Sequence, residues 1–252
     1  MVATNLRILA HQLRPVLEAE SRYRIMDAAN NAQSYRPNST GHQRGRSQIG
    51  QAPWRVYIDS ENSMRFKPSE LDSRLAPDIF CDIEGPTSVD WPHSKQKLVI
   101  RVWSLDKTLS FRDEWDSDKL SDSLADGSSA RVMLRLHFDR SDPDQEAPVF
   151  HLQIGGHPRN PQRELCWFPE TVNIPRLLYP PMDLVLASEV VVANFFPSLF
   201  ERLLETGEWT SLVNHSEAFL LESFYRKCHN ECNEVSRSSR TLFDRWWQRC
   251  TG

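Results

Sequence analysis

Hydrophobic and polar positions along the chain change their period twice, and the changes divide it into three regions. Apolar residues first recur every three or four positions, then alternate with polar ones, and finally return to the wider spacing. The wider spacing is typical of an amphipathic helix, and alternation is typical of a strand with one buried face. The pattern therefore predicts a helical start, a set of antiparallel strands and a helical end.

The first region, residues 5–35, is predicted to be helical because leucines and valines recur at helical spacing. Pro15 is expected to kink or split this helix, since proline has no amide hydrogen to donate. Residues 34–53 then become polar and rich in Gly, Asn, Gln and Arg. This composition indicates a long loop.

Alternation with a period of two begins at Trp54 and predicts the sheet. We expect a hairpin over residues 54–66, in which two short strands flank a polar turn. Residues 68–97 contain four prolines and are expected to be irregular. Strands are predicted over residues 98–105, 131–139 and 148–154.

The last two predicted strands alternate cleanly, which favours an antiparallel sheet with one face in solvent. Four apolar side chains of the first should share a face: Val132, Leu134, Leu136 and Phe138. In the second, Phe150, Leu152 and Ile154 should point inward while His151 and Gln153 point outward.

Residues 180–197 are the most apolar run and predict the central helix on which the rest packs. Pro181 suits a first helical position, and Asp183 then lies in the first turn, where the helix dipole favours an anion. Only fifteen residues separate Pro181 from Pro197, whereas a membrane span needs about 20. Further helices are predicted over residues 208–235 and 240–249.

This order of elements predicts an α+β fold in which an antiparallel β-sheet (a meander) is packed on one side by helices, with a C-terminal helical part. We place the α+β core, with the N-terminal helix, the sheet and the central helix, at residues 1–197. Residues 198–252 form a C-terminal helical extension that is expected to pack on this core.

Composition narrows the function classes. The chain has 252 residues, of which 39% are hydrophobic, so it is long enough to bury a sizeable core. Its net charge of −4 gives no general attraction to nucleic acid or to anionic lipid. The five cysteines are scattered and no apolar signal segment is visible, which favours reduced thiols in the cytoplasm. We expect no membrane contact and no cofactor.

One candidate site combines His157, Asn160 and Cys166. The stretch resembles the active-site region of ubiquitin-conjugating (E2-type) enzymes, where a His-Pro-Asn turn precedes an acceptor cysteine. The resemblance implies that Cys166 carries the modifier and that the Asn160 amide stabilises the oxyanion. Arg159 interrupts the motif here, and the alternative is a turn beside a buried cysteine.

Two groups of residues are candidate metal ligands. Cys228 and Cys232 share a helix face and would hold zinc together with Cys250 or His215. The alternative is a pair of ordinary reduced thiols. The second group would bind a divalent ion or else form an ordinary turn; it consists of His137, Asp139, Asp142 and Asp144.

Basic and aromatic residues suggest binding surfaces. Arg36, Arg44 and Arg46 lie in the polar loop, which is either a disordered connector or a strap that orders on a phosphate or an acidic partner. Trp246 and Trp247 stand among arginines near the C-terminus. They are candidates for weak nucleic-acid contact, for docking on a protein or for closing the core.

A second resemblance rests on three stretches, namely Phe150–Gly156, Ile174–Arg176 and Pro180–Leu186. A strand that ends in Gly-Gly and a helix that starts with Pro-Pro-Met-Asp are similar to uncharacterised bacterial proteins of antiviral-defence or mobile-element operons. The resemblance implies an accessory adaptor or sensor subunit that works through larger partners of the same operon. The resemblance supplies no site residues; Arg176 and Asp183 are candidate binding residues because they lie at the N-terminal end of the central helix. An E2-like enzyme and a nucleic-acid-binding subunit remain the alternatives.

Overall fold

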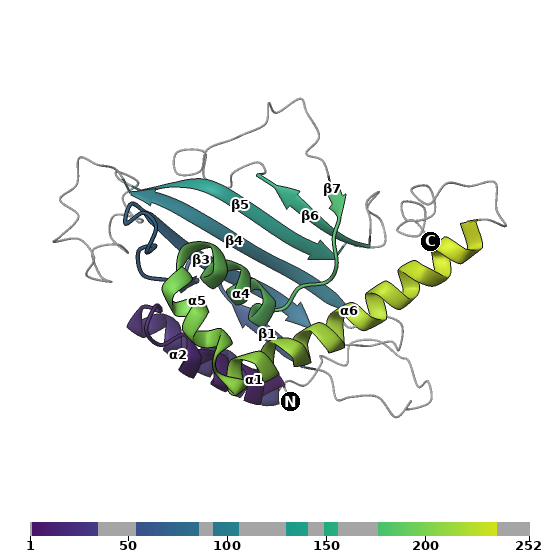
Figure 1. Ribbon diagram of the computed structural model, residues 1–252, viewed down its shortest axis with the longest axis horizontal. Helices are drawn as coiled ribbons and strands as arrows, with labels where there is room; N and C mark the ends of the chain where they lie inside the picture. The colour runs from purple at the N-terminus through teal and green to yellow at the C-terminus, as the bar shows by residue number, and fades with distance from the viewer. Residues whose placement is uncertain are drawn as a thin grey trace.

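The computed structural model describes residues 2–34, 54–85, 93–105, 130–140, 149–155 and 176–235, and it confirms the predicted α+β class (Figure 1). The helices are α1 (Val2–Gln12), α2 (Ala19–Ser34), α4 (Leu184–Phe195), α5 (Pro197–Leu204) and α6 (Gly207–Val235). The strands are β1 (Arg55–Ile58), β2 (Met64–Arg65), β3 (Leu75–Glu84), β4 (Lys95–Leu105), β5 (Ala130–Arg140), β6 (Phe150–Ile154) and β7 (Arg176–Leu178).

The strands form one antiparallel sheet in the order β1-β3-β4-β5-β6-β7, with β2 also paired to β3. Helices pack against one face of this sheet, as predicted (Figure 1). The shared core includes Ile79 of β3, Leu98 and Ile100 of β4, and Val191 of α4. The sheet and the helices are thus held together mainly by burial of apolar surface.

The predicted hairpin over residues 54–66 is wrong. Both β1 and β2 pair with β3, since Ile58 lies opposite Cys81 and Met64 lies opposite Ile79. The two strands therefore continue in one direction along β3. The polar residues between the two strands form a turn, in which the Asp59 side chain accepts the Glu61 backbone N–H at 2.7 Å. Asp side chains commonly stabilise turns by such hydrogen bonds to the backbone two residues on.

The expectation that residues 68–97 are irregular is also wrong, because they contain the central strand β3 and the start of β4. The irregular structure was predicted because of Pro77, since proline is rarely found in a central strand. Pro77 is the third residue of β3, near the strand's end, where it removes only one donor. Ile79, Cys81 and Ile83 then bury their side chains almost fully.

A β-bulge changes the predicted faces of β5. Val102 lies opposite Leu134 while Trp103 lies opposite Val132, so Met133 is an extra residue without a partner in β4. Beyond the bulge, Val132 faces the side opposite to Leu134, contrary to the prediction that both share a face. One inserted residue reverses the direction of the side chains beyond it, and the alternation of apolar and polar residues in the sequence does not show where this happens.

The sheet buries side chains on both faces, so the expectation of one solvated face is wrong. Phe80, Val99 and Trp103 lie on the face away from the helices, yet each is at most 8% exposed. In β6, His151 is buried although it was predicted outward, and Ile154 is 37% exposed although it was predicted inward. When both faces of a sheet are buried, apolar and polar residues no longer alternate according to which face they occupy, so the alternation does not predict burial.

Proline and an acidic cap define the helix ends around the core. Pro15 lies in the turn between α1 and α2, as the predicted split requires. Asp183 is the N-cap of α4, so it precedes the first turn, and Pro181 stands before the helix and not at its first position. The helix begins later than predicted because the Asp183 side chain accepts the Leu186 N–H, which makes Asp183 the cap and Leu184 the first helical residue.

The last described helices share the same core as the rest of the chain. Leu199 and Leu203 of α5, and Trp209, Leu212 and Leu220 of α6, are buried in it. Figure 1 shows the C-terminal half of α6 projecting past the sheet. Among the described helices, none combines the length and the apolarity that a membrane crossing requires.

Candidate functional site

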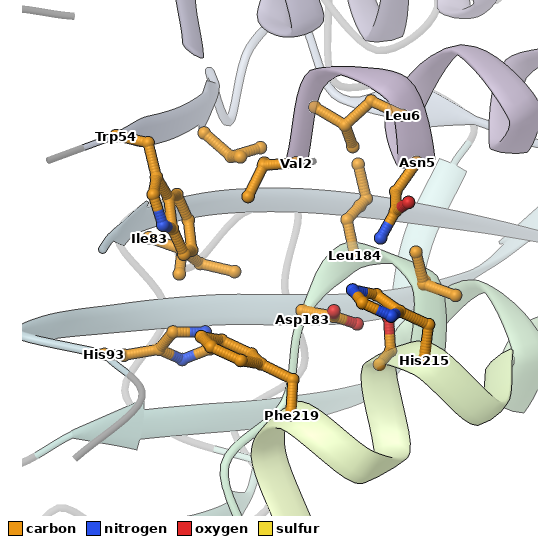
Figure 2. A pocket seen from close by; sticks show the side chains of 13 residues that line it. Val2, Asn5, Leu6, Trp54, Ile83, His93, Asp183, Leu184, His215 and Phe219 are labelled. Atoms are coloured by element: carbon orange, nitrogen blue, oxygen red, sulfur yellow. The ribbon is translucent and has the colours of Figure 1, made fainter. Parts of the chain in front are cut away.

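A pocket lies where α1, the start of α4 and the middle of α6 meet β1 and β3 (Figure 2). We call it the Trp54–Asp183 pocket after residues at its two ends. Its cavity measures about 50 Å³, and a water molecule needs at least roughly 10–15 Å³, so a small ligand fits. The apolar wall includes Val2, Leu6, Val56, Ile83, Leu184 and Val185.

Asp183 supplies a carboxyl group to this pocket because it caps α4. Its backbone is extended (φ −117°, ψ −177°), and its Oδ1 accepts the Leu186 N–H at 2.9 Å. Burial raises the pKa of the carboxyl, while the hydrogen bond from the Leu186 N–H opposes the rise. A positively charged ligand group would stabilise the ionised carboxylate at this place.

His93 supplies a hydrogen-bond acceptor. Its Nδ1 lies 3.0 Å from Oε1 of Gln96, an oxygen that also accepts the Met182 backbone N–H at 2.9 Å. Because that oxygen only accepts, Nδ1 carries the proton and Nε2 has a free lone pair. Nε2 is buried and has no hydrogen-bond partner among the described residues.

Trp54 supplies a donor beside His93. The two rings meet edge to face, with centroids 5.7 Å apart at 87°. The indole packs directly on Gly85, where an added Cβ would lie 2.3 Å from Trp54 Nε1. Within the described part of the chain, this Nε1 has no hydrogen-bond partner. Phe219 of α6 closes the same end, with its ring centroid 6.5 Å from that of His93.

The chemistry of these groups suits binding better than catalysis. Burial, helped by the nearby Arg140 charge, lowers the pKa of His93 to about 4. A histidine that acts as a general acid or base needs a pKa near the working pH. Outside the pocket, burial raises the pKa of the Cys81 thiol of β3, and a protonated thiol is a poor nucleophile. The pocket therefore offers fixed hydrogen-bonding groups in an apolar wall, as ligand sites do.

Most residues that the sequence singled out lie outside the described part of the chain. They are His157, Asn160, Cys166, Arg36, Arg44, Arg46, Trp246 and Trp247. Thioester transfer and nucleic-acid binding through these residues stay predictions. Two candidate binding residues are described: Asp183 lines the pocket, whereas Arg176 begins β7, which is the edge strand at the other side of the sheet from β1. The structure does not bring Arg176 and Asp183 into one site.

The candidate zinc ligands divide between two places. His215 lines the Trp54–Asp183 pocket, while Cys228 packs beside Phe150 and Phe224. Both lie on α6, thirteen residues apart, which at 1.5 Å per residue is roughly 20 Å. Zinc ligands lie within roughly 2.3 Å of the ion, so His215 does not join Cys228, and that alternative is wrong. Cys250 and the side chain of Cys232 lie outside the description.

The second candidate metal group is described only in part. His137 Nδ1 lies 3.8 Å from Asp139 Oδ2, and Asp142 and Asp144 fall in residues 141–148, outside the description. Across the described ranges, no three His, Cys, Asp or Glu side chains are arranged to hold a metal ion.

Sequence reasoning missed Trp54, His93 and Phe219 as members of one site. Trp54 was assigned to a strand by its alternation, and His93 lay in the stretch that was predicted to be irregular. The only signal in the sequence was Asp183 at the start of the most apolar run. The other residues meet it through tertiary packing alone.

Comparisons of the chain with protein-family models, with curated proteins and with solved structures give no match.

Proposed function

We propose that this chain is a sensor subunit that binds a small ligand in the Trp54–Asp183 pocket and acts through protein partners. The observation that carries the proposal is a cavity of about 50 Å³ with a mainly apolar wall, which Asp183, His93 and Trp54 also line. A few fixed polar groups in an apolar wall are typical of small-ligand sites.

The position of the pocket supports a sensing role. Its wall takes residues from α1, α4 and α6 as well as from the sheet, so a bound ligand contacts three helices at once. A ligand shifts a conformational equilibrium when it contacts the two states differently. The C-terminal half of α6 projects past the sheet (Figure 1). A ligand that changes how α6 packs at the pocket would therefore also shift the position of this projecting half.

The partner half of the proposal comes from the resemblance to proteins of bacterial defence or mobile-element operons. The edge strand β7 supports it. Among the described strands β7 lies at the edge of the sheet, and its Leu177 and Leu178 are 51% and 44% exposed. An open strand edge can pair with another chain.

A thermal-shift screen of small polar molecules tests the ligand-binding half. The pocket is blocked by Asn5→Phe, since Asn5 lines it from α1. Thr4→Phe is the matched control, because Thr4 is the preceding residue of α1 and is exposed. We expect compounds that raise the melting temperature of the wild type and of Thr4→Phe, but not of Asn5→Phe. Compounds that stabilise all three proteins equally would show that the pocket is not the site.

A further inference from the structure

The Trp54–Asp183 pocket has two chemically different ends (Figure 2). Polar side chains stand at one end, namely those of Asn5, Asp183 and His215. Three rings and one aliphatic side chain form the other, which we call the aromatic end: Trp54, Ile83, His93 and Phe219. A ligand that extends along the pocket therefore meets polar groups at one end and these four side chains at the other.

The aromatic end is apolar towards a ligand. Trp54 Nε1 and His93 Nε2 are both buried, so a ligand meets the ring carbons of these residues. The other ring nitrogen, His93 Nδ1, is already hydrogen-bonded to Gln96 at 3.0 Å. Ile83 and Phe219 add only hydrocarbon surface. A hydroxyl or charged group placed at this end would lose its hydrogen bonds to water and gain none from these side chains, which is unfavourable.

The mouth of the pocket lies between α1 and α6. Several lining residues on these two helices are partly exposed, namely Val2, Asn5, His215 and Phe219. The lining residues on the sheet side are buried, namely Trp54, Val56, Ile83 and His93. A ligand therefore places its leading part at the buried aromatic end and keeps its polar part near the mouth, where Asn5 and His215 stand.

The volume of the pocket limits the part of the ligand that is enclosed. A cavity of roughly 150 Å³ holds the six carbons of benzene, which is roughly 25 Å³ for each carbon. This pocket measures about 50 Å³, so about two carbons fit inside it. An unbranched chain end has this size, whereas a branched end with three methyl groups would overfill the pocket.

We propose that the pocket binds its ligand through an unbranched aliphatic chain end, with about two carbons enclosed at the aromatic end and the polar part of the ligand at the mouth. Removal of the chain end from water drives the binding. The inference rests on the proposed function, because it names the class of ligand for the same pocket.

Three four-carbon alcohols test the class against the full chain, with binding followed by protein NMR titration. 1-Butanol has an unbranched aliphatic end, tert-butanol has a branched one, and 1,4-butanediol carries a second hydroxyl group on the end that would be enclosed. We expect saturable binding of 1-butanol in the millimolar range for so few atoms. A buried hydroxyl without a partner is unfavourable, so 1,4-butanediol should bind roughly tenfold more weakly. A branched end overfills the pocket, so tert-butanol should also bind roughly tenfold more weakly or worse.

Two matched variants locate the chain end. Ile83→Val removes one methyl group from the aromatic end, a change that folded proteins usually tolerate. The larger space should reduce the preference for 1-butanol over tert-butanol by about fourfold, the effect of one buried methylene. Ile79→Val is the control, because Ile79 is buried on the same face of β3 but in the core outside the pocket. It should leave the preference unchanged.

The outcomes separate this inference from the proposed function. If 1,4-butanediol or tert-butanol binds as tightly as 1-butanol, the unbranched aliphatic class is overturned while the pocket remains a ligand site. If none of the three alcohols binds, the class is also overturned, and the thermal-shift screen with Asn5→Phe decides separately whether the pocket binds another class. A preference that Ile83→Val and Ile79→Val change equally, or that neither changes, would overturn the placement of the chain end at the aromatic end.

Discussion

His93 Nδ1 lies 3.0 Å from Gln96 Oε1, and that oxygen also accepts the backbone N–H of Met182. One side-chain oxygen thus fixes the imidazole tautomer and ties it to the segment that leads into α4. The Gln96 amide nitrogen completes the set by donating to the Phe138 carbonyl at 3.1 Å. This buried amide joins β4, β5 and the pocket, so its loss should be costly.

Gln96→Leu should therefore lower the free energy of unfolding. Leucine has a similar volume to glutamine but no hydrogen-bonding group. The substitution therefore leaves the His93 Nδ1–H and the Met182 N–H buried and unpaired. Each unpaired group costs about 1–3 kcal/mol, so we expect a loss of roughly 2–5 kcal/mol in urea unfolding. Lys97→Ala, on the opposite face of the same strand, should change stability by no more than about 0.5 kcal/mol. Equal stability of Gln96→Leu and the wild type would contradict the proposed tautomer.

The neutral state of His93 predicts acid sensitivity. Its pKa is about 4 in the folded protein, whereas the ordinary value is 6.5. The unfolded chain thus binds more protons between these values, and stability falls as the pH falls from 6.5 towards 4. Because one pKa unit corresponds to about 1.4 kcal/mol, His93 contributes a loss of about 3 kcal/mol over this window.

His93→Gln isolates this effect from other titrating groups. Asp183, Glu189 and Glu18 have raised pKa values, so their contributions have the opposite sign and are lost as the pH rises. They remain in both proteins and cancel in the comparison. Urea unfolding at several pH values should show that the wild type depends on pH more steeply than His93→Gln, by about one proton. Parallel curves would mean that His93 is not buried in its neutral form.

Gly85→Ala should damage both the fold and the pocket. The added Cβ would lie 2.3 Å from Trp54 Nε1, so the indole ring must move. Overpacking of this kind costs about 1–3 kcal/mol, and we expect ligand binding to weaken as well. Gly207→Ala is the control, because nothing lies within 4 Å of its added Cβ. If both substitutions had the same small effect on the melting temperature, the close approach of Trp54 to Gly85 would be wrong.

The Asp183 cap predicts different effects for two substitutions. Asp183→Ala removes the acceptor for the Leu186 N–H and should destabilise the protein by about 1 kcal/mol. Asp183→Asn keeps a side-chain oxygen at the same place and should retain most of that stability. Urea unfolding of the two variants measures the difference. A result in which Asn is as harmful as Ala would argue that the charge, and not the cap, is what matters.

Periodicity and apolar runs were enough to predict that elements lie at α4, α6, β4 and β5, because each has a long apolar or periodic stretch. It failed at β3, where Pro77 hid a strand whose apolar residues are packed on both faces. It also failed at Met133, because a bulge reverses the faces without changing the residue pattern. For the pocket, Asp183 could be predicted from its place before the apolar run, but Trp54 and His93 could not. Trp54 precedes β1 and His93 precedes β4, and the two meet because β3 pairs with both strands, which only the tertiary structure shows.

The indole N–H signal of Trp54 in a ¹⁵N-correlated NMR spectrum tests the central claim most directly. The chain has eight tryptophans, and the signal lost in Trp54→Phe identifies the one at the pocket. During titration with a compound found in the thermal-shift screen, the Trp54 signal should move in a saturable way, while that of Trp209, buried elsewhere in the core, should stay in place. A Trp54 signal that moves with none of these compounds would contradict ligand binding in this pocket.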